Sequence, residues 1–412
     1  MLDRRVATRR WRTRLGVGLL LGLAVVYTWA TWNYFTRRVP GGNDFLAHYT
    51  AWEAYLKLGL NPYSDAAALH TQQAIYGRPA RPGEDQNRMT YPFYSIVVHG
   101  PFVYIEYPLA RAIYMTLLQA ALFLGVAATL ALVKWQPPSW LLMLTLGWSL
   151  LFYPEARGVL LGQFAIFGFF ALAGALFLLR QGRDTLAGAL LVLTTVKPTL
   201  VFLVIPFLLL WAAARRRWRF VAAFTGVWLA LTLGSLLVLP SWIGDWLYRV
   251  VRYPEYTVGQ GPVWLLMHHV LPALGQPVEW AISGALVIGM LWAWRRAIQH
   301  EGKVEFHWAL GLTLVISNLI VPRSATTNYV LMLMPTLWAF AALDRHERYG
   351  RMALLTVILI SLMGYWWLHL ATVIGNAEQP ILFIPWPLTL GAAFWLGRDW
   401  LLRDAEQAGV WL

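Results

Sequence analysis

Long apolar runs recur throughout this 412-residue chain, and they restrict its fold more than any other feature of the sequence. A helix that crosses a bilayer needs about 20 mostly apolar residues. Twelve runs approach or reach that length, at about 15–35, 108–133, 139–153, 159–179, 185–197, 198–214, 218–240, 278–297, 305–321, 328–343, 352–373 and 381–397. Only 13% of the residues are charged, whereas a soluble domain carries about 25%. The chain is therefore predicted to be an all-α, polytopic membrane protein with about twelve spans in one transmembrane domain, 1–412.

The basic residues lie in short segments between the apolar runs and predict the topology. If the N-terminus is cytoplasmic, most of the 33 basic residues fall on the cytoplasmic side, as the positive-inside rule expects. An even number of spans then makes both termini cytoplasmic, in a multi-pass protein of the plasma membrane. The stretches 37–107 and 241–277 become the two long extracytoplasmic loops. The first run is longer than the apolar core of a signal peptide, so we expect an uncleaved first span.

The net charge of +13 is explained by this topology and by contacts with lipid head groups. Membrane lipids are therefore expected partners, and nucleic acid is not. In the first outer loop, 44–58 is predicted to be a helix and the polar, proline-rich stretch 78–90 to be mobile. Residues 91–107 are predicted to form a short re-entrant or interfacial helix, since irregular backbone at that depth must line a cavity or be buried in protein. Residues 263–275 are predicted to form another interfacial helix.

Asp44 is the leading candidate for a catalytic residue. It follows two glycines and Asn43 just beyond the first apolar run, at the predicted outer surface. A carboxylate there can accept the proton of a hydroxyl nucleophile, and partial burial would raise its pKa towards a useful range. The alternative interpretation is structural, since Asn or Asp after glycines is a common helix N-cap.

Three cationic side chains could bind an anion at the same surface. Lys197 interrupts an apolar stretch directly before Pro198, and a cation within a span marks a functional site by default. Arg157 and Arg323 lie in predicted outer turns, against the charge bias, and arginine is suited to bidentate phosphate binding. The alternative for each is a contact with lipid head groups, including snorkelling of the lysine.

Several kinds of site are not indicated by the sequence. The chain has no cysteine, no HExxH motif, no Walker-type loop and no GxSxG motif. Adjacent histidines at 268 and 269 point to different helix faces and do not predict a metal site. Glu84 and Asp85 could bind a divalent cation, although an acidic pair in a polar loop is more often only solvated. We therefore expect no metal and no cofactor.

Six short motifs, in order, resemble those of glycosyltransferase family 87, whose mannosyltransferases are polytopic enzymes of GT-C architecture. They are D-F-x-x-x-Y-x-A at 44–51, G-L-N-P-Y at 59–63, T-Y-P-F at 90–93, L-G-Q-F at 161–164, the A-G…K-P-T pattern at 187–199 and the basic R-R-R-W-R turn at 215–219. The resemblance covers about residues 40–260 and is looser afterwards. Family members often carry a histidine near 323–328, where this chain has P-R-S-A-T-T-N, so the role of the late outer loop stays open.

The resemblance implies inverting transfer of a hexose, usually mannose, from a polyprenyl-phosphate donor to a lipid-linked or cell-envelope glycan acceptor. It also implies that Asp44 is the general base. Lys197, Arg323 and Arg157 would then stabilise the donor phosphate without a metal. Mannose, arabinose and glucose are not distinguished. Substrate-binding roles are predicted for His48, Tyr49, Tyr63, Tyr91, Gln163 and Asn328.

The principal rivals are a secondary transporter and a lipid flippase without catalytic activity. A transporter would place ionisable side chains at mid-membrane and relate its halves by a repeat. The carboxylates of Glu106, Glu279 and Glu305 instead lie near the ends of the apolar runs. A flippase would not need Asp44.

Overall fold

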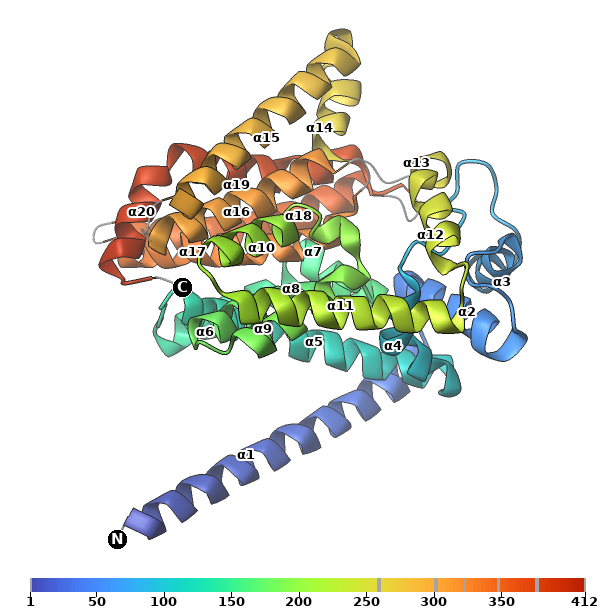
Figure 1. The fold of residues 1–412 in the computed structure, drawn as a ribbon, viewed down its shortest axis with the longest axis horizontal. Helices are drawn as coiled ribbons and strands as arrows, with labels where there is room; N and C mark the ends of the chain where they lie inside the picture. The colour runs from blue at the N-terminus through green and yellow to red at the C-terminus, as the bar shows by residue number, and fades with distance from the viewer. Residues whose placement is uncertain are drawn as a thin grey trace.

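The computed structural model describes residues 2–257, 261–299, 303–321, 324–346, 349–374 and 378–410, and only the backbone of 2–15, 17 and 303. These residues form 20 α-helices joined by short 3-10 and π-helical turns (Figure 1). The prediction of an all-α fold is confirmed. Proline stands in the first turn of several helices, where its missing N–H has no helical partner to lose.

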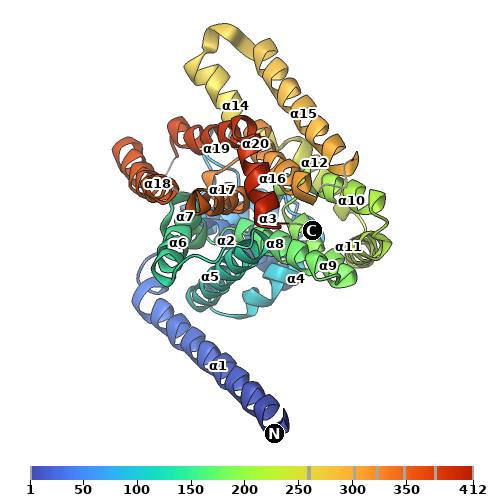
Figure 2. The ribbon, with the colours of Figure 1, turned by 90° about the vertical axis from the view of Figure 1, so that its left-hand side faces the viewer.

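Most helices run along the long axis of the molecule and form one bundle (Figures 1 and 2). The bundle helices are α5 (Tyr107–Leu132), α6 (Ser139–Leu151), α7 (Tyr153–Leu161), α8 (Ala165–Arg180), α9 (Asp184–Leu191), α10 (Val204–Ala214), α11 (Trp218–Val238), α16 (Lys303–Ile320), α17 (Leu333–Arg345), α18 (Gly350–Thr372) and α19 (Pro385–Leu396). Small residues bring their backbones close: a Cβ at Gly188 of α9 would overlap the carbonyl of Phe220 in α11.

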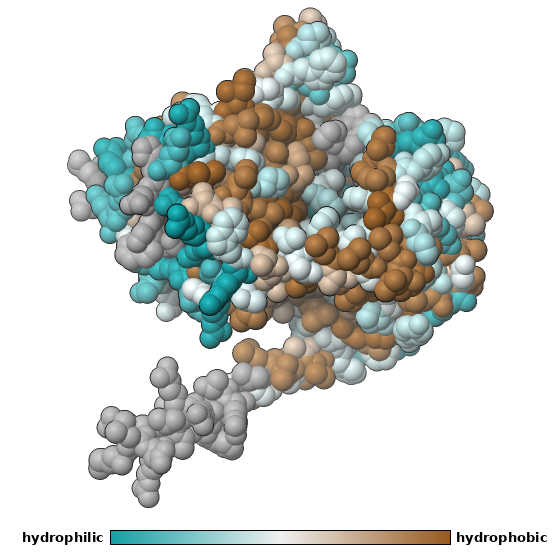
Figure 3. Space-filling view, in the orientation of Figure 1, coloured by the Kyte–Doolittle hydropathy of each residue, from teal (hydrophilic) through white to brown (hydrophobic). Residues whose placement is uncertain are grey.

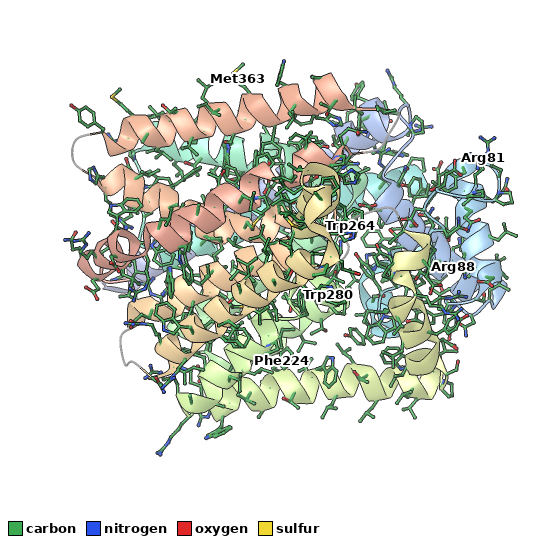
Figure 4. The ribbon with its side chains drawn as sticks, turned by 90° about the horizontal axis from the view of Figure 1, so that it is seen from above. Arg81, Arg88, Phe224, Trp264, Trp280 and Met363 are labelled. Carbon is green, nitrogen blue, oxygen red and sulfur yellow. The ribbon has the colours of Figure 1, made fainter. Side chains whose placement is uncertain are left out.

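The surface of the bundle is apolar across its middle and polar at its two ends (Figure 3). Seen from above, α18 and α11 form opposite sides of the bundle (Figure 4). Both helices expose apolar side chains, such as Met363 on α18 and Leu233 and Leu237 on α11. A belt of this kind suits a lipid environment. The molecule is therefore a multi-pass membrane protein.

The number of helices able to cross a bilayer is smaller than the twelve expected. Among the described residues, five helices are long and apolar enough, and up to seven if each of two bent pairs counts as one span. The bent pairs are Tyr153–Leu161 with Ala165–Arg180, at 115°, and Pro380–Leu396 with Arg398–Gln407, at 71°. About twelve spans are therefore not supported.

The reason for the difference is helix length. Several expected spans are helices of 10–17 residues, namely Ser139–Leu151, Asp184–Val196, Val204–Ala214 and Val304–Ile320. At about 1.5 Å per residue they reach roughly 15–26 Å, short of the roughly 30 Å hydrocarbon core. Apolar composition reports burial in either protein or lipid, so an apolar run alone does not count spans. The first expected run lies in α1 (Leu2–Thr31), which stands clear of the bundle along most of its length (Figure 1).

One polar end of the bundle is capped by the helices of the two long loops. They are α2 (Asn43–Leu58), α3 (Asp65–Tyr76), α4 (Ile96–His99), α12 (Trp242–Val251) and α13 (Tyr253–Tyr256). The helix predicted at 44–58 is confirmed as α2, which ends where Gly59 adopts a left-handed conformation. The opposite end carries α20 (Arg398–Gln407) and the basic turns, which are the turns with clustered basic residues, among them 180–183 and 215–219 (Figure 1).

The segment predicted as an interfacial helix at 263–275 is more irregular than expected. It consists of α14 (Pro262–Leu265), a π-helical turn at 266–270 and a 3-10 turn at 272–274. It then continues into α15 (Gly275–Gln299), and together they form a hairpin that projects sideways from the bundle (Figures 1 and 2).

Hydrogen bonds join the two loops into one cap. Arg249 of α12 donates to the Tyr63 carbonyl (2.7 Å) and pairs with Asp65 (2.8 Å), while Trp246 donates from its indole to the Thr90 carbonyl (2.8 Å). Further bonds link Asn61 to Asp245, Thr257 to Asp85, and the Gln86 amide to the Tyr256 carbonyl. The polar stretch 78–90 thus uses its side chains and backbone for contacts, which do not support the expected mobile segment.

Candidate active site

A cavity of about 580 Å³ lies where the cap meets the end of the bundle. Its volume is within the roughly 300–1,000 Å³ typical of small-molecule sites. The lining residues come from nearly every part of the chain: α2, the 78–90 stretch, α7, the α9–α10 connection, α12, α13, the α14 segment and the segments around 324–328 and 378–383. Six of the residues singled out in the sequence line it, namely Asp44, Tyr91, Arg157, Gln163, Lys197 and Asn328.

Asp44 occupies the first turn of α2 and faces the cavity. The N-cap of this helix is Gly42, with φ 77°, and no side chain makes a capping hydrogen bond there. The interpretation of Asp44 as a helix cap is therefore wrong. Glycine is needed at the cap, because a Cβ at Gly42 would lie 2.7 Å from Nε of Arg111 and 2.8 Å from the Tyr107 hydroxyl.

A chain of hydrogen bonds connects the acid to a lysine. Gln163 donates from Nε2 to Oδ2 of Asp44 (2.8 Å) and accepts at Oε1 from the Lys197 ammonium (2.7 Å). Lys197 also donates to Oδ1 of Asn328 (2.8 Å). Gly162, with φ 76°, makes this possible, because a Cβ there would overlap the Cβ of Phe45 beside Asp44. The amide of Gln163 thus bridges the two charged groups, which form no direct ion pair.

Lys197 lies at a break in the backbone. The α9 helix gives way to 3-10 turns at 192–196 and 198–200 before α10 begins, and Pro198 prevents the helix from continuing. Irregular backbone in a membrane bundle is tolerated where it lines a cavity, as it does here. The two hydrogen-bond acceptors of the ammonium are both neutral amides, so its charge remains available to an anion in the cavity.

Burial sets the protonation behaviour of the cap residues. Removal from water raises the pKa of Asp44 above its ordinary value, and the positive charges of Lys197 and Arg157 only partly oppose this. Burial also lowers the pKa of His48 well below that of a free imidazole, aided by the nearby His99 and Lys197. Asp44 is therefore a stronger base than an exposed aspartate, while His48 is neutral.

Arg157 lines the cavity but is already paired. Its guanidinium forms an ion pair with Glu378, which also accepts hydrogen bonds from Thr326 and, at 3.1 Å, from Tyr153. Because Glu378 compensates the charge of Arg157, Lys197 is the better candidate for binding an anion. The sequence analysis did not single out Glu378, which lies in a polar connection without a motif.

The remaining predicted residues lie in three different places. His48 packs against Tyr91, with ring centroids 4.1 Å apart, and sits behind the cavity lining. Tyr63 supports Tyr91 from behind by donating to its carbonyl (2.9 Å), and Tyr49 is buried with its hydroxyl on the Ile105 carbonyl (3.0 Å). Arg323 lies outside the described residues.

Asn328 is not simply the first residue of a span. It lies inside a 3-10 turn, Thr326–Met332, and holds Lys197 while donating to the Ser324 hydroxyl (3.3 Å). The segment around 324–328 therefore reaches the cavity with amide and hydroxyl groups.

The sequence analysis missed a wall of the cavity that both outer loops contribute. Asp85 of the first loop lines the cavity together with Trp246, Val250 and Tyr253 of the second. Asp85 was interpreted as one half of a solvated acidic pair, although its position just before the T-Y-P-F motif was a usable signal. Within the described ranges, no group of three or more His, Asp or Glu side chains could hold a metal ion.

Comparison with known proteins identifies the family. The sequence matches the model of glycosyltransferase family 87 over residues 89–322, which is more than half of the chain. No curated protein and no solved structure matches the chain. The matched region includes Tyr91, Arg157, Gln163 and Lys197, while Asp44, Asn328 and Glu378 lie outside it. The chain belongs to glycosyltransferase family 87 and is a membrane glycosyltransferase.

Proposed function

We propose that the protein moves a hexose, with mannose as the first candidate, from a polyprenyl-phosphate donor to a hydroxyl group of a glycan acceptor. The transfer inverts the anomeric centre, and Asp44 is the general base. The single observation that carries this proposal is the arrangement of Asp44, Gln163 and Lys197, which brings a base and a cation to one cavity without neutralising either.

The chemistry follows from this arrangement. The acceptor oxygen attacks the anomeric carbon while Asp44 takes the hydroxyl proton, and the bond from that carbon to the phosphate oxygen breaks. The electron pair leaves with the polyprenyl phosphate, whose negative charge grows by one. Lys197 stabilises that developing charge in an enclosed site, where electrostatic stabilisation is strong. Asp44 and Lys197 are bridged by one amide. The base that acts on the nucleophile and the cation that acts on the leaving group are therefore close neighbours.

The position of the cavity supports a lipid donor. Its lining residues come from the cap and from the adjoining end of the bundle, and the surface there changes from the apolar belt to the polar cap (Figure 3). A phosphate can therefore enter while its prenyl chain stays in the bilayer. Leu265 and His269, which belong to the irregular segment at the base of the projecting hairpin, also line the cavity. By the distribution of basic turns, we assign the cap to the extracytoplasmic side and both termini to the cytoplasm.

Replacement of the base tests the proposal. Asp44→Asn keeps the size of the side chain and an oxygen that can accept from Gln163, but it cannot take a proton. We expect transfer from polyprenyl-phosphate mannose to fall by about 10²–10⁴-fold, measured with purified protein in detergent or nanodiscs.

Thermal unfolding of the variant and the wild type provides the control for this experiment. Because burial disfavours the ionised carboxylate, the asparagine variant should unfold at the same temperature as the wild type or a higher one. A folded variant with undiminished transfer would remove Asp44 as the base. Polyprenyl-phosphate glucose and arabinose, tested with the wild type, identify the sugar.

A further inference from the structure

Besides Asp44 and the paired Glu378, a third carboxylate lines the active-site cavity, and it comes from the cap. Oδ1 of Asp85 accepts from the Asn87 backbone N–H (2.8 Å), and Oδ2 accepts from the Thr257 hydroxyl (3.2 Å). Among the described side chains, no cation pairs with it. A carboxylate has about four lone-pair positions, so Asp85 can still accept hydrogen bonds from a molecule in the cavity.

Glu84, next to Asp85 in the chain, differs from it because its carboxylate is fully paired. Glu84 forms a bidentate pair with Arg78, at 2.7 and 2.8 Å, and accepts from the Arg81 backbone N–H (2.7 Å). It does not line the cavity. Only one member of this acidic pair therefore has unused acceptor capacity directed at the site.

Two aromatic rings share the wall with Asp85. Trp246, Val250 and Tyr253 are spaced by four and three residues, so they lie on one side of the α12–α13 segment, and all three line the cavity. The indole of Trp246 is held by its hydrogen bond to the Thr90 carbonyl. A fixed aromatic ring offers a flat apolar surface, and a sugar ring has a C–H face that fits it.

We propose that Asp85, Trp246 and Tyr253 form the acceptor-binding wall, which recognises two neighbouring hydroxyl groups of an uncharged sugar. This rests on the proposed function. The negative charge of Asp85 excludes the donor phosphate from this wall, because that phosphate is attracted to Lys197. The same charge selects against acceptors that carry a phosphate or carboxylate next to the accepting hydroxyl.

The placement of the wall agrees with this assignment. Lys197 and Arg157, proposed for the donor, belong to bundle helices and their connections. Asp85 and both aromatic residues belong to the polar cap, the part of the molecule that carries Arg81 and Arg88 (Figure 4). A glycan that approaches from the aqueous side reaches the cap first, and the lipid donor reaches the bundle side first.

A comparison of sugar analogues tests the wall. The probes are an alkyl mannoside and its 2-, 3- and 4-deoxy analogues, assayed with saturating polyprenyl-phosphate mannose. With the wild type, removal of a hydroxyl bound by Asp85 should raise the acceptor KM by about ten- to hundred-fold, as expected for a hydrogen bond to a charged group. With Asp85→Asn, the same analogue should differ from its parent by less than about threefold, while the donor KM stays within twofold of the wild type.

The matched control is Glu84→Gln, which removes a charge one residue away without touching the cavity and should leave the discrimination between analogues as in the wild type. Val250→Phe adds bulk to the wall at a partly exposed position. It should raise the acceptor KM without changing the donor KM, which keeps the test decisive if Asp85→Asn does not fold.

Two outcomes would overturn the inference: equal discrimination by Asp85→Asn and the wild type, or a parallel rise in the donor KM. Failure of the wild type to use any polyprenyl-phosphate sugar would instead remove the proposed function. Active wild type with unchanged discrimination removes the acceptor wall alone.

Discussion

Gln163 explains how a base and a cation can share one small cavity. A direct ion pair between Asp44 and Lys197 would hold the carboxylate ionised but occupy both groups. The amide instead satisfies one oxygen of Asp44 and one hydrogen of Lys197, at 2.8 and 2.7 Å. Each charged group therefore keeps hydrogen-bonding capacity for a substrate, and burial rather than pairing dominates the pKa of Asp44.

The raised pKa of Asp44 predicts the pH dependence of transfer. The base must be ionised, so activity is present above its pKa in the folded enzyme and is lost as the pH falls through that value. Because burial raises this pKa, the acidic limb of kcat/KM should lie above the ordinary aspartate value of 3.8. A profile of kcat/KM against pH, at a fixed donor concentration well below KM, measures the limb. An acidic limb at or below 3.8 would contradict the prediction.

Lys197 should act on the donor rather than on the acceptor. Lys197→Met removes the charge and nearly preserves the length of the side chain, and we expect kcat/KM for the donor to fall by about 10–100-fold. The acceptor KM should change by less than threefold. Lys57→Met, at an exposed lysine of α2 paired with Glu53, provides a control for the loss of positive charge. A change confined to the acceptor KM would show that Lys197 binds the acceptor and would contradict its assignment to the donor.

Among the structural elements, the turn between α7 and α8 controls the geometry of the site. The two helices meet at 115°, and Gly162 at the bend places Gln163 against α2. Its left-handed backbone and its closeness to Phe45 both exclude a side chain. The turn between the two helices, rather than the face of either helix, thus sets the distance between Asp44 and Lys197.

Alanine at Gly162 separates these two effects. Gly162→Ala should destabilise the protein by about 1–2 kcal/mol from backbone strain and a further 1–3 kcal/mol or so from overlap with Phe45. Gly59→Ala has a similar φ, 68°, but its Cβ would meet no atom within 4 Å, so only the strain applies. Thermal unfolding and transfer rate should therefore be clearly lower for Gly162→Ala. Equal losses in both variants would show that the Phe45 contact is unimportant.

The cap and the basic turns define two opposite ends of the whole molecule. The described chain begins and ends on the side of the basic turns, away from the cap (Figure 1). An apolar belt separates these ends (Figure 3). For the proposed function, this arrangement would let a lipid donor enter the cavity from the membrane and a glycan acceptor enter it from the aqueous side.

Single cysteines test the sidedness without interference, because the natural chain has none. Arg81→Cys lies on the exposed surface of the cap, and Arg219→Cys lies at the start of α11 beside the basic turn. A membrane-impermeant maleimide applied to intact cells should label the first and spare the second until the membrane is opened. Labelling of both from the same side would contradict the proposed topology.

The sequence alone determined the class of protein and six of the residues that line the cavity. Charge content and apolar runs are properties of composition, so they predicted an all-α membrane protein without knowledge of its packing. Asp44, Gln163 and Lys197 were predicted because each is costly or conspicuous in an apolar chain, or lies in a short motif. Their hydrogen-bonded connection was not predicted, because it joins residues 119 and 34 positions apart.

Three-dimensional packing determined the features that depend on distant contacts. Hydropathy cannot separate burial in lipid from burial in protein, so short buried helices were counted as spans. Asp85 resembled a solvated loop residue until Thr257 and the α12–α13 segment were placed beside it. Glu378 likewise gained a role only through its ion pair with Arg157. Local sequence specifies which groups are available, whereas their partners depend on how the chain folds back on itself.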